Sequence, residues 1–284
     1  VPSRDMPTHP MFSVKLPQTF YTSSPLSTTT NPNFIFKTVK INKKEYNIST
    51  LKYKDKPPFM VDTVPLTIVI GTEKYITLHG LLTVLYSDNT KYKWKSDKTD
   101  WNTFANNVKK QLRDINMPDI TQWDVSNVTN MDFLFYNCYK FDESLKWDTS
   151  KVTSMNNMFQ YASNFDRNIG NWTVDNVTDM SYMFASTDNF KGTNIGNWNT
   201  LKVKNMNHMF SLAKNFDTDI GKWKMNNVTD TSNMFFGAEK FTGKNINNWD
   251  VSNINNTASM FDGAIIFNEN INSWKVEKIT NMNA

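Results

Sequence analysis

The sequence predicts an α/β repeat solenoid with about 25 residues per coil, preceded by a small β-rich domain and a capping helix. The composition changes near the middle of the chain, and beyond that point tryptophans recur every 24 to 26 residues. They are Trp123, Trp147, Trp172, Trp198, Trp223, Trp249 and Trp274. A fixed period of this length is typical of a stacked array in which each unit contacts only its neighbours.

Residues 1–33 are rich in proline, serine and threonine, as in "TSSPLSTTTNPN" at residues 22–33. A segment with so few apolar side chains cannot bury enough surface to offset the conformational entropy lost on ordering. We therefore expect an extended arm that is either disordered or bound to a partner.

Residues 34–95 predict a small β-rich domain. The strand-like segments "FIFKTVKI" and "EYNISTLKY" are separated by Asn42, Lys43 and Lys44, and "LTIVIGTEKYITL" turns near Gly71 and Thr72. β-branched and aromatic runs separated by such turn residues indicate two hairpins.

Residues 96–122 predict a capping helix and a connection. Asp100 is a candidate N-cap, and the helix is expected to stop before Pro118. The residues of its apolar face are Trp101, Phe104, Val108, Leu112 and Ile115. A helix just ahead of the first coil can cover the apolar end of a stack. We therefore expect a chain starting near residue 97 to fold alone.

Residues 123–284 contain six full coils and one partial coil, and we number positions from each tryptophan as position 0. Phenylalanine occupies positions 12 and 18 of every full coil, position 5 is β-branched, and positions 8 and 11 are mostly methionine. All length variation lies between position 18 and the next tryptophan, a step of 6 to 8 residues. Because insertions are tolerated in surface loops, the segment from position 0 to position 18 is the packed part.

The three central coils define the predicted repeat core. Its members are Trp147, Val152, Met155, Met158, Phe159, Phe165, Trp172, Val177, Met180, Met183, Phe184, Phe190, Trp198, Val203, Met206, Met209, Phe210 and Phe216. Within a coil we expect a short extended segment through Val-Thr-x-Met, one helical turn around Met-Phe-x-x-Ala, and a polar return.

The repeats carry a family resemblance. The strings "WDVSNVTNM", "WDTSKVTSMNNMF" and "WTVDNVTDMSYMF" resemble the unit of the BspA-like leucine-rich repeat family. The resemblance covers residues 123–284 and implies a leucine-rich-repeat-like solenoid in a surface-exposed or adhesive protein of mycoplasmas, other bacteria, some protists or large DNA viruses. Thr231 and Thr257 depart from the methionine of the motif, and the last copy stops at "WKVEKITNMNA".

Charge divides the chain. Residues 1–122 hold 17 Lys and Arg against 10 Asp and Glu, a net charge of +7, whereas residues 123–284 hold 14 against 17, a net charge of −3. The lysines of the basic half are scattered among β segments without a nucleic-acid-binding motif, so we expect no nucleic acid partner. The apolar run "PLTIVI" is far shorter than a membrane span, so no transmembrane segment is expected.

Few residues suggest chemistry. The histidines are His9, His79 and His208, and none has a histidine or cysteine at metal-ligand spacing. His208 occupies a position held by asparagine in sister coils, which favours a surface substitution over a functional site. Cys138 replaces a small core residue, which favours a packed thiol over a nucleophile. We therefore predict no enzyme, no cofactor and no metal site.

Repeated polar residues have two interpretations each. The aspartates that follow the tryptophans and the second phenylalanines are Asp124, Asp148, Asp250, Asp142, Asp166 and Asp217. Turn and cap residues are favoured over a calcium site, because lysine and threonine interrupt both columns. The glycosylation sequons are at Asn47, Asn127, Asn171, Asn176, Asn227 and Asn255. Because the sequon is part of the repeat motif itself, a structural role is favoured over glycans.

The outer surface of the stack is what remains for function. We expect a non-enzymatic protein–protein interaction or adhesion module, located at a cell surface or outside the cell, whose solenoid surface binds one or more protein partners. The alternative is a structural component of a large DNA virus particle, located in the virion. In either case residues 1–95 would join the protein to a larger assembly and residues 123–284 would present the recognition face.

Overall fold

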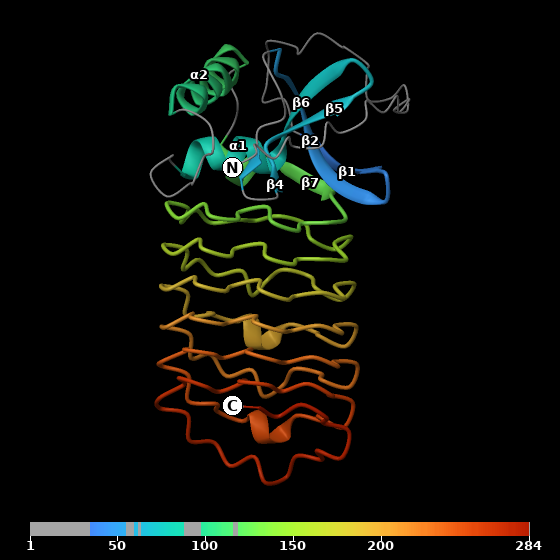
Figure 1. The fold of residues 1–284 in the computed structure, drawn as a ribbon, viewed down its shortest axis with the longest axis vertical. Helices are drawn as coiled ribbons and strands as arrows, with labels where there is room; N and C mark the ends of the chain where they lie inside the picture. The colour runs from blue at the N-terminus through green and yellow to red at the C-terminus, as the bar shows by residue number, and fades with distance from the viewer. Residues whose placement is uncertain (1–34, 55–59, 62–63, 88–97, 116–118, 284) are drawn as a thin grey trace, which may run out of the picture.

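The computed structural model describes residues 35–54, 60–61, 64–87, 98–115 and 119–283. Figure 1 shows a stack of coils that runs to the C-terminus, with a β-sheet and two helices at the N-terminal end of the stack. The sheet has strands β1 (Ile35–Ile41), β2 (Lys44–Lys52), β5 (Thr67–Ile70), β6 (Glu73–Thr77) and β7 (Asp124–Asn127) in the order β5-β6-β2-β1-β7. Strands β3 (Met60–Val61) and β4 (Val64–Pro65) pair separately.

The last strand of the sheet belongs to the first coil. β1 and β2 form an antiparallel hairpin through Asn42 and Lys43, whose φ angles of 48° and 66° suit the tight turns of hairpins. β7 pairs with β1 in parallel. The N-terminal sheet and the stack are therefore joined by backbone hydrogen bonds.

Residues 34–95 are not only β-structure, because α1 (Leu78–Tyr86) follows β6 directly. Thr77 caps α1, since its hydroxyl accepts a hydrogen bond from the Gly80 N–H at 2.9 Å. Gly80 also lets the helix approach β5, because a Cβ at this position would lie 2.2 Å from the Leu66 carbonyl oxygen. The short apolar run of α1 could not be distinguished from a strand by its periodicity.

The helix predicted to cap the first coil does not cap it, because α1 lies against the first coil and α2 (Lys98–Asp114) forms an outer layer (Figure 1). α2 packs on α1 and β2: Gln111 Nε2 donates to the Lys52 carbonyl at 2.7 Å, and the Phe104 ring contacts Tyr53. A short 3₁₀ helix, η2 (Ile120–Gln122), then leads into the first coil.

Side chains of the N-terminal part take the place of a preceding coil. In the stack, carbonyls of each coil accept hydrogen bonds from the coil before it, and the first coil has none before it. Instead, Asn47 Nδ2 donates to the carbonyl of residue 130 at 2.7 Å, and His79 Nδ1 bonds the carbonyl of residue 134 at 3.1 Å. Ser87 Oγ adds a bond to the neighbouring carbonyl of residue 137 at 3.1 Å. The cap therefore satisfies backbone groups that would otherwise be buried without partners.

Each coil is connected to the next at position 7. The parallel bridges run through Asn130, Ser154, Asp179, Asn205, Asp230, Asn256 and Asn281. From position 8 to position 14, even-numbered N–H groups donate to the next coil, whereas those of positions 11 and 13 donate to the carbonyl three residues earlier. The helical turn expected around Met-Phe-x-x-Ala is therefore a run of β-turns, because half of its N–H groups bond between coils.

Aromatic side chains form continuous columns inside the stack. At position 12, Phe159, Phe184 and Phe210 stack with ring centroids 5.6 Å apart and planes within 5° of parallel. Each later tryptophan donates its indole N–H to a carbonyl of the preceding turn, as Trp198 does to Ile169 at 3.2 Å. All eighteen residues of the predicted repeat core are buried.

The return loops absorb the differences in coil length. The two longest loops each contain a 3₁₀ helix, η3 (Ile195–Asn197) and η4 (Ile246–Asn248), and the second residue of each loop is a glycine of positive φ, Gly192 or Gly243. The extra residue is thus placed in a turn outside the aromatic columns.

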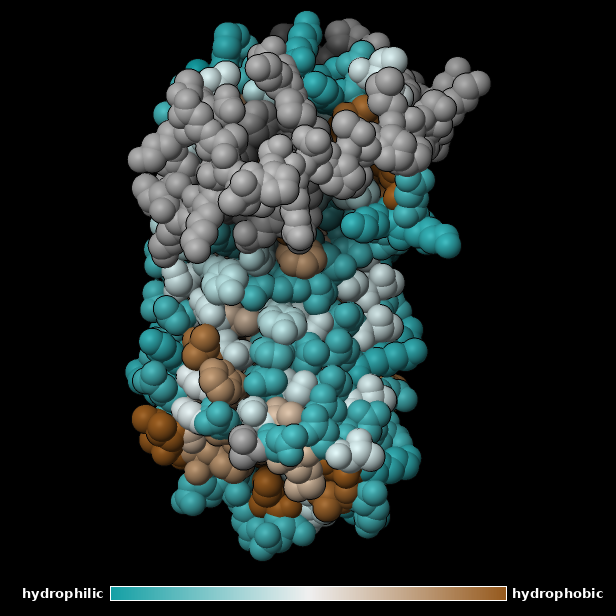
Figure 2. All heavy atoms as spheres, viewed as in Figure 1, coloured by the Kyte–Doolittle hydropathy of each residue, from teal (hydrophilic) through white to brown (hydrophobic). Residues whose placement is uncertain are grey.

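The C-terminal end of the stack is more exposed than its centre. Phe261, Phe267 and Trp274 are only partly buried, although their equivalents in earlier coils are fully enclosed. In Figure 2 the hydrophobic side chains of this view gather towards the lower, C-terminal end. The exposed apolar residues of the last coils are Ile265, Ile266, Val276 and Met282.

Candidate functional site

The β-turns of the coils place two positions in the left-handed region of backbone space. Positions 10 and 14 have φ between 49° and 74° in all six full coils. Position 10 is held by Phe133, Asn157, Tyr182, His208, Asn233 and Ser259. Position 14 is held by Asn137, Tyr161, Ser186, Leu212, Gly237 and Gly263. This backbone conformation suits glycine and asparagine, whereas a bulky side chain costs about 1–2 kcal/mol.

Bulky residues nevertheless occupy several of these positions, mainly in the first four coils. Together with a neighbouring tyrosine they form a surface that we call the aromatic strip. Its members are Phe133, Tyr136, Tyr161, Tyr182, His208 and Leu212. Sister coils build the same turn from asparagine or glycine, so the turn itself does not require these side chains.

Most members of the strip contact another member of the strip. Tyr136 lies 5.6 Å from Phe133 and 5.7 Å from Tyr161, measured between ring centroids. The His208 ring stacks on Tyr182 at 4.2 Å with the planes 8° apart. Tyr161 is 43% exposed and Leu212 is 39% exposed. The strip therefore contains two groups of contacting rings, one in the first two coils and one in the third and fourth.

Carboxylates accompany the strip. Asp132 accepts hydrogen bonds from Ser154 Oγ and the Asn156 N–H, and its burial, together with the charge of Asp179, raises its pKa. Asp230 bonds Ser232 within its own coil. The pKa of Tyr182 is raised by burial and by the charge of Asp230, which places this carboxylate within electrostatic reach of the rings.

Two polar atoms beside the strip have no hydrogen-bond partner in the part of the chain that the structure describes. They are Asn207 Oδ1 and His208 Nδ1, both buried as atoms although their residues are partly exposed. Burial lowers the pKa of His208, so its imidazole is neutral near pH 7. A neutral imidazole with its proton on Nε2 offers Nδ1 as an acceptor. Both atoms are enclosed by other protein atoms and do not reach the surface of the strip.

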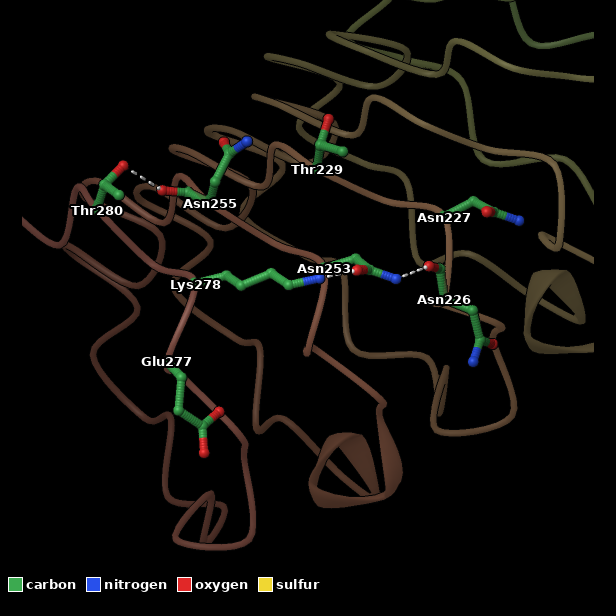
Figure 3. A pocket seen from close by; sticks show the side chains of 8 residues that line it. All are labelled: Asn226, Asn227, Thr229, Asn253, Asn255, Glu277, Lys278 and Thr280. Atoms are coloured by element: carbon green, nitrogen blue, oxygen red, sulfur yellow. Dashed lines mark hydrogen bonds between the residues drawn. The ribbon is translucent and has the colours of Figure 1, made fainter.

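A different face holds a shallow polar depression, shown in Figure 3. It spans the last three coils and is lined by Asn226, Asn227, Thr229, Asn253, Asn255, Glu277, Lys278 and Thr280. Lys278 Nζ donates to Asn253 Oδ1 at 2.6 Å, and Asn253 Nδ2 donates to the carbonyl of residue 226 at 2.7 Å. These polar groups already pair with one another between coils, so the depression is part of the hydrogen-bonding lattice of the stack.

The remaining candidates from the sequence have structural surroundings. His79 is buried in the cap, Cys138 is buried with a pKa raised by desolvation, and His9 lies outside the described residues. Because the Leu134 carbonyl can only accept, His79 carries its proton on Nδ1, and Nε2 faces the Thr83 hydroxyl at 3.3 Å. Burial of the imidazole lowers the pKa of His79 to about 4.

This surrounding makes the stability of the cap depend on pH. The unfolded histidine has a pKa near 6.5, so between pH 6.5 and about 4 the unfolded chain binds a proton that the folded chain excludes. The free energy of unfolding should therefore fall by about 3 kcal/mol through His79 alone as the pH is lowered across this range. Urea unfolding at a series of pH values should show a shallower dependence for His79→Gln. An identical dependence in both proteins would contradict this assignment.

The repeated aspartates and asparagines bond the backbone. Asp148 Oδ1 accepts from the Ser150 N–H at 2.9 Å, and Asp166 Oδ1 accepts from the Lys191 N–H at 2.9 Å in the next coil. Among the sequon asparagines, Asn176 Nδ2 donates to the Ser150 carbonyl and Asn227 Nδ2 to the Leu201 carbonyl. No three histidine, cysteine or acidic side chains gather into a metal site within the described ranges. Nor does any helix there have the length and apolar character to cross a membrane.

The strip was not identified from the sequence. Positions 10 and 14 of the six full coils comprise twelve residues, of which five are asparagine or glycine. That enrichment was the available indication of a left-handed backbone. With the turn unrecognised, the tyrosines and Leu212 read as ordinary variation of a repeat surface.

Comparison with known proteins supports one family. No curated protein and no solved structure matched the chain. The family described as "Mycoplasma protein of unknown function, DUF285" matches residues 99–194 and again residues 186–284. This match is consistent with the BspA-like resemblance of the repeats. Because the two matches together span well over half of the sequence, the chain belongs to the DUF285 family.

Proposed function

We propose that the protein is a repeat solenoid that acts as a non-enzymatic protein–protein interaction module and presents its aromatic strip to a protein partner. The observation that carries this proposal is the placement of bulky side chains at left-handed positions. Strained backbone residues concentrate at functional sites, where the surrounding structure compensates for their cost. Here the hydrogen bonds on both sides of each coil provide that compensation.

The internal repeats provide the comparison that supports a surface role. Tyr182 occupies the same turn position as Asn157 and Asn233, and Leu212 the same position as Gly237. The core columns beneath are equivalent in all of these coils. Since the coil folds with the smaller residues, the larger side chains contribute chiefly to the outer surface.

The residue types on the strip favour a protein partner over a reaction. Tyrosine is enriched at protein interfaces because its rigid ring adds contact area at a low entropy cost. Acid–base chemistry would need a nucleophile, a base and an orienting group within hydrogen-bonding distance of each other. The strip offers a single histidine stacked on a tyrosine, which supports a binding role.

The test is a double variant of the full chain, Tyr161→Asn with Tyr182→Asn. Asparagine is the residue that sister coils use at both positions, so the fold should be retained, with an unchanged or higher urea midpoint. Proteins that cross-link to the wild-type chain in extracts of its source are identified by mass spectrometry. The amount of these proteins captured by the double variant should be at least tenfold lower.

The control is Asn197→Ala in an exposed return loop, which should capture the same proteins as the wild-type chain. Equal capture by the double variant and by this control would show that the strip is not the recognition surface.

A further inference from the structure

We propose that the segment recognised by the aromatic strip is an extended polypeptide rich in arginine and lysine, bound along the axis of the stack. This inference rests on the proposed function and adds the chemistry of the partner. It follows from the charge of this face of the stack and from the dimensions of the strip.

Basic residues are excluded from the turn that carries the strip. Positions 7 to 14 of the six full coils comprise residues 130–137, 154–161, 179–186, 205–212, 230–237 and 256–263. All 14 lysines and arginines of residues 123–284 lie at other positions. The charged residues inside these segments are Asp132, Asp179, Asp230 and Asp262. This face of the stack is therefore acidic and aromatic.

The carboxylates of this face lack cationic partners in the described part of the chain. The ion pairs of the stack join Arg167 to Asp142 and Lys191 to Asp166, both in the return loops. Asp179 and Asp230 bond only uncharged groups, namely serine N–H and hydroxyl groups and an asparagine amide. Their negative charge has no ion-pair partner among the residues that the structure describes and attracts a cationic ligand over a range of about 8–10 Å at physiological ionic strength.

Arginine and lysine side chains carry donors and no acceptors. A guanidinium or ammonium group at this face would therefore pair with the Asp179 and Asp230 carboxylates.

The dimensions of the strip fit an extended segment. Its members lie on four successive coils, and hydrogen-bonded chain segments lie about 4.8 Å apart, so the strip is about 15 Å long. An extended polypeptide advances about 3.3 Å per residue, so about five residues span it. The tyrosine rings suit arginine, which stacks on aromatic surfaces. A polyanion such as nucleic acid is disfavoured, because it would place phosphates against the carboxylates.

The experiment uses the full chain and a fluorescent ten-residue peptide of alternating arginine and serine, with binding followed by fluorescence anisotropy. A peptide of alternating glutamate and serine and a single-stranded DNA oligonucleotide serve as comparison ligands. The arginine peptide should bind the wild-type chain, and its affinity should fall as salt is raised from about 50 to 300 mM.

The decisive variant is Asp179→Asn with Asp230→Asn. Asparagine already occupies position 7 in sister coils, where Asn205 Oδ1 accepts from the Asn207 N–H at 3.0 Å, so the turn is retained. The arginine peptide should bind this variant at least tenfold more weakly. The matched control is Asp148→Asn with Asp250→Asn, which also removes two negative charges, here at position 1, where a sister coil carries Asn199. Its affinity for the peptide should change less than twofold.

Three outcomes would overturn the inference. The first is no binding of the arginine peptide to the wild-type chain. The second is equal affinity in the decisive variant and in its control. The third is that Tyr161→Asn with Tyr182→Asn weakens binding of the glutamate peptide or the oligonucleotide but not binding of the arginine peptide. If capture of proteins in the cross-linking experiment still depends on the strip while any of these holds, the proposed function stands and the basic partner does not.

Discussion

Replacement of Phe184 by alanine should lower the free energy of unfolding by about 3–5 kcal/mol, because it opens a cavity in the centre of the aromatic columns. Phe184 is 0% exposed, and its ring stacks between Phe159 and Phe210 at 5.6 Å on each side. It also lies 4.0 Å from the ring of Phe190. The urea midpoint of the variant measures the effect.

Two matched variants test whether this cost comes from stacking between coils. Phe261→Ala changes the same position in the last full coil, where the ring is only partly buried and stacks on Phe235 alone within its column. Its cost should be less than half that of Phe184→Ala. Asn197→Ala in a return loop should stay within about ±0.5 kcal/mol. An unchanged midpoint for Phe184→Ala would remove the basis for interlocked aromatic columns.

Deletion of residues 1–97 should abolish independent folding of the stack. The deletion removes β1, α1 and the donors of Asn47, His79 and Ser87, which satisfy the backbone of the first coil. The apolar end beneath α1 would then face water, and exposed ends of repeat stacks aggregate. Size-exclusion chromatography and circular dichroism of the truncated chain should show aggregates or an unfolded chain.

The control for this deletion is a chain that begins at residue 35, which keeps every one of these contacts. A monomeric, cooperatively folding chain from residue 98 onward would show that α2 alone suffices as a cap. The expectation from the sequence was that such a chain folds alone, and the position of α2 in the outer layer reverses it (Figure 1).

The elements ahead of the stack differ in how far their sequence specifies them. The β1–β2 and β5–β6 hairpins have turn residues that suit a tight reversal, Asn42 with Lys43 and Gly71 with Thr72, so local chemistry is sufficient to indicate them. α1 has no such local indication. Its residues Leu78, Leu81 and Leu82 are apolar on several sides because the helix is enclosed by sheet, α2 and coil, and such burial removes the helical periodicity.

The repeated spacing carried the most information about the coils. Positions 0, 5, 12 and 18 never change their distance from one another in the full coils, and in the central coils the structure buries the side chains at these positions. A side chain packed between its equivalents in two neighbouring coils cannot shift without breaking both contacts. Invariant spacing in the sequence therefore indicates which side chains are packed.

The left-handed turns and the capping helix were decided by contacts between distant parts of the chain. The positive φ of Tyr161, Tyr182 and Leu212 opposes the local preference of these residues, and it is imposed by N–H groups that bond carbonyls about 25 residues further along. The choice of α1 over α2 as the cap depends in the same way on the carbonyl row of the first coil, about 50 residues after His79 and Ser87. Both features result from hydrogen bonds that form only when coils are stacked, whereas propensity and periodicity describe a single segment.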